Sequence, residues 1–169
     1  MNPEPLIACV DVDYRIPGAV AAGLWFRGWT AEVAEFQATA QFPGVAPYEP
    51  GAFYLRELPC LIGVLALGPK PDAVIVDGYV WLANGAKGLG AHLHDVLGGI
   101  IIGVAKTRFA GVTDAVEVRR GASQSPLFVS AFGMPVEEAA ARIAEMHGQY
   151  RVPTLLKCVD AISRSAGVE

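Results

Sequence analysis

The stretch Leu6–Tyr14, which reads LIACVDVDY, decides the fold of this chain. Its apolar residues, among them Ile7, Cys9 and Val10, follow one another as in a buried β-strand. An acid inside such a strand is costly unless it is paired, hydrogen-bonded or bound to a metal. Asp11 therefore marks a candidate functional position in what we expect to be a central strand.

Two further strands are predicted directly after this one, over Ala19–Trp29 and Ala31–Thr39. The turn at Arg27–Thr30 is short, which favours an antiparallel hairpin and a meander of the first three strands. The next segment, Gln41–Gly51, holds three prolines and two glycines and is expected to be a loop.

Helices and strands alternate through the rest of the chain. Gly51–Gly68 has helical spacing, but Pro59 predicts a break near Glu57–Pro59, since proline is tolerated only in the first turn of a helix. Asp72–Asp77 and Gly99–Ala105 are continuous apolar runs, typical of strands covered on both faces. The other expected elements are a helix at Gly88–Leu97, strands at Val116–Arg120 and Leu127–Phe132, and helices at Pro135–His147 and Thr154–Ser165, the last capped by Thr154.

This order of elements predicts an α/β fold. The expected sheet is mixed, with three antiparallel strands followed by parallel strands, and helices flank it. Each strand–helix–strand crossover should be right-handed. The length of 169 residues suits a single domain over residues 1–169.

The composition excludes several classes of protein. Hydrophobic residues make up 53% and charged residues 18% of the chain, which excludes intrinsic disorder. The longest uncharged apolar runs, Leu58–Gly68 and Gly98–Ala105, are shorter than the ~20 residues of a membrane span, so no membrane partner is expected. Met1–Pro5 lacks a basic segment, which argues against a signal peptide. The three scattered cysteines fit reduced thiols, and we expect a cytoplasmic protein.

The charge balance narrows the choice of partner. The net charge is −4 and the isoelectric point about 5.4, which disfavours a protein that binds nucleic acid through bulk positive charge. An acidic chain is still compatible with a nuclease, because divalent cations held by its carboxylates reverse the local sign of the charge.

Three acids stand at informative places: Asp11 inside the first strand, Glu57 in the sequence YLRE, and Asp77 at the end of the strand VIVD. Their convergence would create a self-repelling cluster that requires a cation, and all-oxygen sites suit Mg²⁺ or Mn²⁺. Hydrolysis of a phosphodiester is the chemistry that such a site supports. In the alternative interpretation Asp77 caps a turn, and Glu57 forms a salt bridge with Arg56 or Arg108.

Several motifs resemble those of the endonuclease V family, nucleases that act at deoxyinosine and on inosine-containing RNA. The string PYEPGAFYLRE at Pro47–Glu57 resembles the family's PYxPGxxxFRE motif, with Leu55 in place of the phenylalanine. The resemblance spans about Leu6 to Ser163 and implies an RNase H-like fold. The other matches, in the family's order, are VDVDY at Val10–Tyr14, VDG at Val76–Gly78, IGVAKTR at Ile102–Arg108, PLFVS at Pro126–Ser130 and YRVP at Tyr150–Pro153.

The resemblance implies roles for individual residues. Asp11, Glu57 and Asp77 take the family's three metal-binding carboxylate positions, for Mg²⁺ with Mn²⁺ as a substitute. Lys106 takes the position of a strand-end lysine near the scissile phosphate, where its positive charge stabilises the reaction. All four are candidate catalytic residues.

The same resemblance implies a substrate-binding surface. Tyr48 matches a wedge tyrosine that separates the strands beside a flipped base, because extrusion of a base leaves a gap to fill. Pro47, Pro50 and Gly51 would stiffen the loop that carries this ring. Gly78 and Gly88 would let a base approach the backbone closely.

Two departures from the family pattern distinguish this chain, which resembles a divergent, short member. Tyr79–Gly85 follows Asp77 without the family's His-Pro-Arg, and Gly133 stands where an SxGH histidine is expected. Three functions therefore compete: an endonuclease acting near a deaminated base in DNA or RNA, a degenerate relative that binds nucleic acid or another ligand with little or no cleavage, and a small metabolite-binding domain. The sequence does not specify the oligomeric state or the choice between DNA and RNA.

Overall fold

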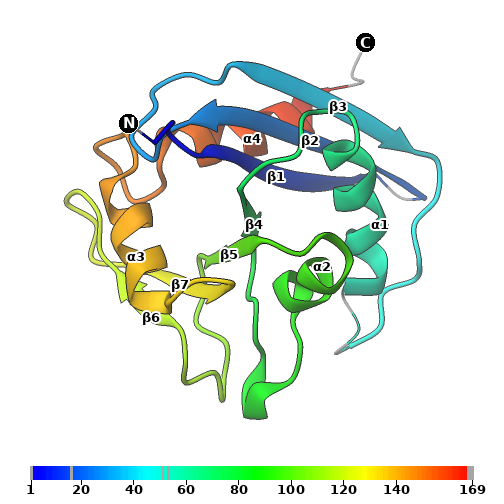
Figure 1. Ribbon diagram of the computed structural model, residues 1–169. Helices are drawn as coiled ribbons and strands as arrows, with labels where there is room; N and C mark the ends of the chain where they lie inside the picture. The colour runs from blue at the N-terminus through cyan, green and yellow to red at the C-terminus, as the bar shows by residue number, and fades with distance from the viewer. Residues whose placement is uncertain (1, 16, 51, 53, 167–169) are drawn as a thin grey trace.

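The structure, a computed structural model, describes residues 2–15, 17–50, 52 and 54–166. Seven strands form one mixed sheet in the order β3-β2-β1-β4-β5-β7-β6, with helices on both faces (Figure 1). The strands are β1 (Leu6–Arg15), β2 (Gly18–Arg27), β3 (Phe36–Phe42), β4 (Ala73–Asp77), β5 (Ile100–Ala105), β6 (Val116–Val118) and β7 (Leu127–Phe132). The helices are α1 (Tyr54–Leu65), α2 (Leu89–Leu97), α3 (Val136–Glu145) and α4 (Thr154–Ser165), with a 3-10 turn at Ala83–Gly85.

The strand directions confirm the predicted sheet. β1, β2 and β3 form an antiparallel meander, and β4 and β5 then run parallel to β1. β7 returns antiparallel to β5, and β6 pairs antiparallel with β7 at the edge. The carboxyl ends of β1, β4 and β5 therefore point to the same end of the sheet.

Two layers of helices cover the central strands. α1 and α2 pack on the face that receives Ala8 and Val10, whereas α3 and α4 pack on the face that receives Ile7 and Cys9. Figure 1 shows α1 and α2 together on the right, α3 on the left and α4 behind β1 and β2. In the described part of the chain no helix combines the length and apolar character needed to cross a membrane.

The third strand lies further along the chain than predicted. The expected strand Ala31–Thr39 is wrong at both ends, because β3 runs from Phe36 to Phe42. β2 sets these bounds by pairing with β3, from Trp25 opposite Phe36 to Ala19 opposite Phe42. The loop begins only at Pro43, whose missing N–H cannot continue a ladder.

Two helix predictions need correction. α1 is continuous through Pro59, so the expected break near Glu57–Pro59 is wrong. The carbonyl that the Pro59 N–H would have bonded belongs to Leu55, a residue that is 47% exposed. Thr154 does not cap α4: Pro153 is the residue before the helix, and the Thr154 hydroxyl contacts His147 Nδ1 at 3.0 Å instead.

Candidate active site

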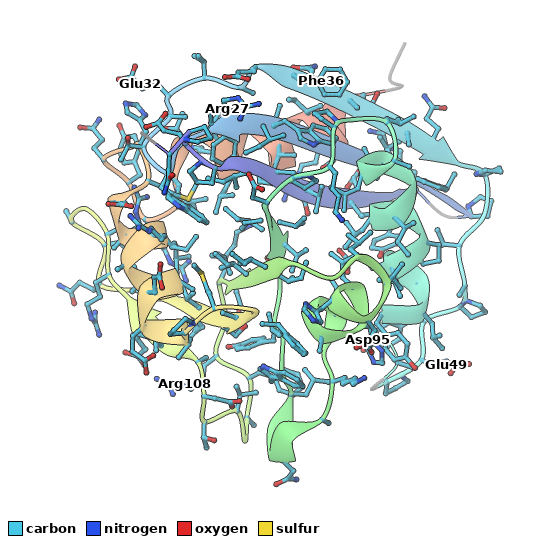
Figure 2. The ribbon with its side chains drawn as sticks, in the orientation of Figure 1. Arg27, Glu32, Phe36, Glu49, Asp95 and Arg108 are labelled. Atoms are coloured by element: carbon cyan, nitrogen blue, oxygen red, sulfur yellow. The ribbon has the colours of Figure 1, made fainter. Side chains whose placement is uncertain are left out.

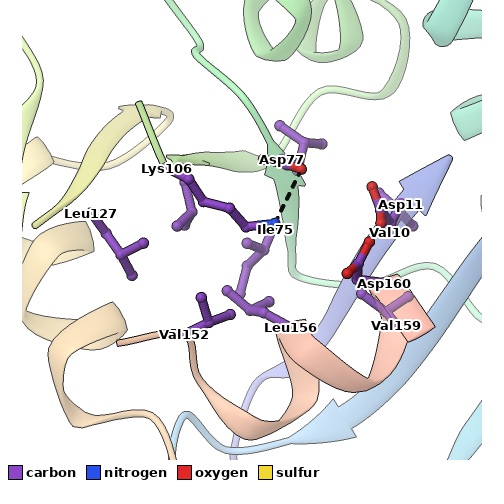
Figure 3. A pocket seen from close by; sticks show the side chains of 12 residues that line it. Val10, Asp11, Ile75, Asp77, Lys106, Leu127, Val152, Leu156, Val159 and Asp160 are labelled. Atoms are coloured by element: carbon purple, nitrogen blue, oxygen red, sulfur yellow. Dashed lines mark ion pairs between the residues drawn. The ribbon is translucent and has the colours of Figure 1, made fainter. Parts of the chain in front are cut away.

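The register of the parallel strands places two of the predicted acids side by side. Val10 of β1 is paired with Val76 of β4, so the residues that follow, Asp11 and Asp77, occupy neighbouring positions on the same face. β5 lies on the other side of β4 and leads into Lys106, whose Nζ lies 3.7 Å from Asp77 Oδ2 (Figure 3). Lys106 thus pairs with a strand-end acid of the cluster, not with a carboxylate on a helix.

A fourth acid, Asp160 of α4, joins the cluster, and the sequence did not lead us to it. Its side chain shares a hydrogen bond with that of Asp11, and Figure 3 shows the two carboxyl groups directed toward each other. The Ser163 hydroxyl approaches the same group at 3.4 Å from Asp11 Oδ2. The sequence did contain an indication that Asp160 faces the core, because it directly follows Val159, which belongs to the buried face of α4.

Glu57 reaches the cluster from the opposite helical layer. Its side chain is only 5% exposed, and its Oε2 atom is buried without a hydrogen-bond partner among the described residues. The alternative pairings for Glu57 are not present: the Arg56 guanidinium lies 4.0 Å from the centre of the Tyr14 ring, and Arg108 pairs with Glu117. A buried carboxylate oxygen with no donor is costly and calls for a cation.

Burial and mutual repulsion disfavour the charged forms of the acids in this cluster. Burial, the hydrogen bond with Asp160 and the charge of Asp77 raise the pKa of Asp11 to about 7. Burial and the charges of Asp77 and Asp11 raise the pKa of Glu57 to about 8. The raised pKa values agree with a carboxylate cluster that repels itself in the absence of a cation.

The oxygen atoms of these acids are the ligands that a divalent cation prefers. Every potential ligand is a carboxylate oxygen, and the unpartnered Glu57 Oε2 would gain a partner from the ion. Among the described residues, no three acidic, histidine or cysteine side chains are grouped tightly enough to share an ion. The predicted convergence of Asp11, Glu57 and Asp77 to metal-sharing distance is therefore not met by the described side chains.

A cavity of about 520 Å³ opens next to Asp77. It lies between the segment around Tyr48, the start of α1 and the loop that follows β4. Tyr48 is 63% exposed on its rim, as expected for an exposed ring, and Glu49 next to it lies at the periphery of the molecule in Figure 2. The lining residues that the sequence singled out are Tyr48, Pro50, Asp77, Gly78 and Gly88. Pro47 is exposed and outside the lining, and Gly51 lies outside the described residues.

The two glycines of the cavity have different reasons to be glycine. Gly78 has φ +134° and open space where a Cβ would stand, so its backbone is accessible to a ligand. At Gly88 a Cβ would lie 2.6 Å from the carbonyl oxygen of Tyr79. A side chain at Gly88 would therefore collide with the loop that follows β4, and Gly88 also lines the cavity, so its role toward a base stays a prediction.

Aromatic rings fix the walls of this cavity. The Tyr54 ring is stacked on His92 with 3.7 Å between ring centres. The Tyr79 hydroxyl donates to the Thr107 carbonyl at 2.8 Å and accepts from the Phe109 N–H at 3.1 Å. A rigid cavity with apolar, aromatic walls and an acid at one end suits a flat ring that carries polar edges.

The two departures from the family pattern lie at different ends of the sheet. Tyr79 and Leu82 line the cavity, so the loop that lacks His-Pro-Arg is part of the candidate site. Gly133 lies at the opposite end, since a Cβ there would stand 2.5 Å from the carbonyl of Gly99, just before β5 begins. A side chain at this position would therefore lie far from the carboxylate cluster, so the resemblance is wrong if it is taken to place a metal or phosphate contact here.

The mixed sheet, with acids at the carboxyl ends of β1 and β4 and helices on both faces, defines an RNase H-like α/β protein. The family model for Endonuclease V matches residues 1–132. The Endonuclease V of Streptomyces coelicolor is 31% identical over 181 residues, which cover 93% of this chain and 77% of that protein. The chain belongs to the endonuclease V family.

Solved structures agree with this assignment. The Endonuclease V of Streptomyces avermitilis has a TM-score of 0.81 at 26% identity and covers 97% of this chain and 83% of its own. The Ciona intestinalis Endonuclease V, solved with a 24mer DNA containing an inosine followed by a ribo-adenosine, has a TM-score of 0.81 at 19% identity, with 95% and 85% covered. Human ENDOV has a TM-score of 0.77 at 21% identity, with 95% and 83% covered. The last two show a shared fold.

Proposed function

We propose that this chain is a divalent-metal-dependent endonuclease that hydrolyses a phosphodiester near a deaminated base, inosine, in DNA or RNA. The observation that carries the proposal is a buried carboxylate cluster next to a cavity with aromatic walls, in a member of the endonuclease V family. In this proposal Asp11, Glu57 and Asp77 are the metal ligands, and Asp160 supports Asp11.

When bound by these acids, Mg²⁺, or Mn²⁺ in its place, would neutralise the scissile phosphate and lower the pKa of an attacking water. The charge of the ion would favour the ionised forms of Asp11 and Glu57, whose pKa values are raised in its absence. Lys106, held 3.7 Å from Asp77, would add positive charge beside the phosphate.

The cavity next to Asp77 would take the modified base after it leaves the helical stack. Gly78 offers accessible backbone there, and the rings of Tyr54 and Tyr79 supply apolar walls. Tyr48 on the exposed rim would occupy the gap that the base leaves. The Ciona complex supports this assignment through the inosine in its DNA.

A second candidate function is the binding of nucleic acid or another ligand with little or no cleavage. The loop 79–85 favours it, because this loop lines the cavity and lacks the family's His-Pro-Arg. A nearby cation, Lys87, also lines the cavity but is paired with Asp95 at 2.5 Å. Gly133 gives this candidate no support, because it lies at the far end of the sheet.

Single-turnover cleavage of fluorescently labelled DNA and RNA strands that contain one inosine, or guanosine at the same place, tests the proposal. We expect cleavage of an inosine strand only with Mg²⁺ or Mn²⁺, and a cleavage rate for Asp77→Asn that is lower by about 10²–10³-fold. Tight binding of the inosine strand without cleavage would favour the second candidate. Equal cleavage of inosine and guanosine strands would contradict the proposed action near a deaminated base, and no binding of either strand would contradict both candidates.

We propose further that residues 1–169 act as a single nuclease domain in the cytoplasm. Both helical layers pack on one sheet and share its strands, which supports one folding unit. A single cooperative unfolding transition, followed by circular dichroism and by tryptophan fluorescence, is the expected result for one domain.

A further inference from the structure

We infer that a second groove beside the carboxylate cluster binds the nucleic-acid strand on the side of the scissile phosphate away from the modified base, with Tyr150 as its stacking surface. The inference rests on the proposed function. The groove, of about 370 Å³, contains Lys106 and Asp160 in its lining, whereas the base cavity contains Asp77. The carboxylate cluster therefore has one binding space next to Asp77 and another next to Lys106 and Asp160.

The groove is basic although the chain is acidic. Lys106, Arg151 and Lys157 line it, and Asp160 is the one acid among its lining residues. The whole chain has a net charge of −4, so this gathering of cations stands out from the average surface. Positive charge along a groove that leads away from a nuclease site is the electrostatic footprint of a phosphate backbone.

Tyr150 presents an exposed ring on a firmly held backbone. The ring is 63% exposed, and the Lys157 ammonium lies 5.6 Å from its centre. Arg120, only 5% exposed, donates hydrogen bonds to the carbonyls of Tyr150 at 2.7 Å and Gly148 at 3.0 Å. A buried guanidinium thus fixes the turn that carries the ring, which lowers the ordering cost of stacking a base on it.

Arg151 connects this turn to the active-site lysine. Its Nη2 atom donates to the backbone carbonyl of Lys106, and to that of Pro126 at 2.8 Å. The stacking surface and the Lys106 strand end are therefore held in a fixed relation. A nucleotide stacked on Tyr150 would keep the adjacent phosphate at a constant distance from Lys106.

Binding of single strands that contain one inosine, measured by fluorescence anisotropy in Ca²⁺, tests the inference. One series of strands is lengthened nucleotide by nucleotide on the 3′ side of the inosine, and the other on the 5′ side. The variants are Tyr150→Ala, Tyr150→Phe, Lys157→Ala and, as a charge-matched control at the far end of the sheet, Lys70→Ala. Thermal unfolding of each variant verifies that it is folded.

We expect added nucleotides to tighten binding through Tyr150 in one series only. There Tyr150→Ala should lose about 10-fold in affinity, while Tyr150→Phe keeps the ring and stays within about twofold. Lys157→Ala should reduce the slope of log affinity against log salt by about 0.7, and Lys70→Ala should leave it unchanged.

The inference would be overturned if Tyr150→Ala bound strands of every length with the affinity of the wild-type protein. It would also be overturned if this variant lost affinity equally in both series. Failure of the proposed function gives a different result. In that case the wild-type protein binds inosine and guanosine strands equally, while the dependence on length and on Tyr150 can still be measured with either strand.

Discussion

The two ends of β4 have opposite chemistry. At the carboxyl end Asp77 stands among Asp11, Glu57 and Lys106, and the pKa values of Asp11 and Glu57 are raised. At the amino end Asp72 accepts a hydrogen bond from the Leu6 N–H at 2.8 Å, which joins the starts of β1 and β4. In the proposed function, two aspartates five residues apart thus serve chemistry in one case and chain packing in the other.

The same division separates the two departures from the family pattern. The loop 79–85 lies at the charged end, where a missing donor can affect cleavage. Gly133 lies at the other end against Gly99, where only packing depends on it. We therefore expect the departure at loop 79–85 to affect cleavage and the departure at Gly133 to affect stability alone.

The largest effect is expected from Asp77→Asn. Loss of one charged ligand from the site should lower single-turnover cleavage of an inosine strand by about 10²–10³-fold. The matched variant Asp72→Asn changes the same atoms at the other end of the strand and should cleave at the wild-type rate. Equal losses in the two variants would remove the distinction between the ends.

Tyr48→Ala should weaken binding to an inosine-containing duplex about 10-fold, because a stacked ring contributes ~1–3 kcal/mol per base. Gel-shift titration of modified and unmodified duplexes measures the difference, with Tyr48→Phe as the control that keeps the ring. An equal loss on unmodified duplex would argue against a wedge role for Tyr48.

The stability of the metal-free protein should depend on pH through Asp11 and Glu57. Their pKa values are about 7 and about 8 in the folded chain, whereas such acids titrate near ~4 when unfolded. The folded chain therefore holds protons that the unfolded chain releases, and stability present below pH ~4 is lost as the pH rises toward 8.

Thermal melts in EDTA between pH 5 and pH 8 measure this dependence. We expect the melting temperature to fall toward pH 8 for the wild-type protein and to fall less for Glu57→Gln, which removes one of the two groups. Mg²⁺ at pH 8 should raise it again, because a ligand that binds only the folded chain stabilises it. If the melting temperature changed with pH equally in the wild-type protein and in Glu57→Gln, Glu57 would not contribute to the pH dependence of stability.

The smallest effect on cleavage is expected from Gly133→Ala. The residue has φ +89°, and a Cβ there would lie 2.5 Å from the Gly99 carbonyl oxygen, so stability should fall by about 1–3 kcal/mol. The cleavage rate of the folded fraction should stay at the wild-type value. A rate that falls in proportion to Asp77→Asn would place Gly133 in the functional site.

Sequence patterns predicted the elements whose own residues define them. Leu127–Phe132 and Thr154–Ser165 have the predicted bounds, because an apolar run in one case and helical spacing after a proline in the other depend on local sequence. The bounds of β3 come from pairing with β2, and α1 continues through Pro59 at a point where the helix is exposed at Leu55. Neither is a property of the segment itself.

The residues of the candidate site also fall into those that the local sequence indicates and those that it does not. Asp11 and Asp77 could be found because each ends or interrupts an apolar strand, where an acid is conspicuous. Asp160 was missed because it lies on an amphipathic helix, where an acid beside the apolar face is common. The remote position of Gly133 follows from the antiparallel pairing of β7 with β5, which no local pattern specifies.

Titration of the purified protein with Mn²⁺, with the free ion measured by electron paramagnetic resonance, is the most direct test of a metal site at the carboxyl end of β4. We expect the wild-type protein and Asp72→Asn to bind Mn²⁺ with equal affinity, and Asp77→Asn to bind at least about tenfold more weakly. Equal binding by all three proteins, or no binding by the wild type, would contradict a metal site built on Asp77.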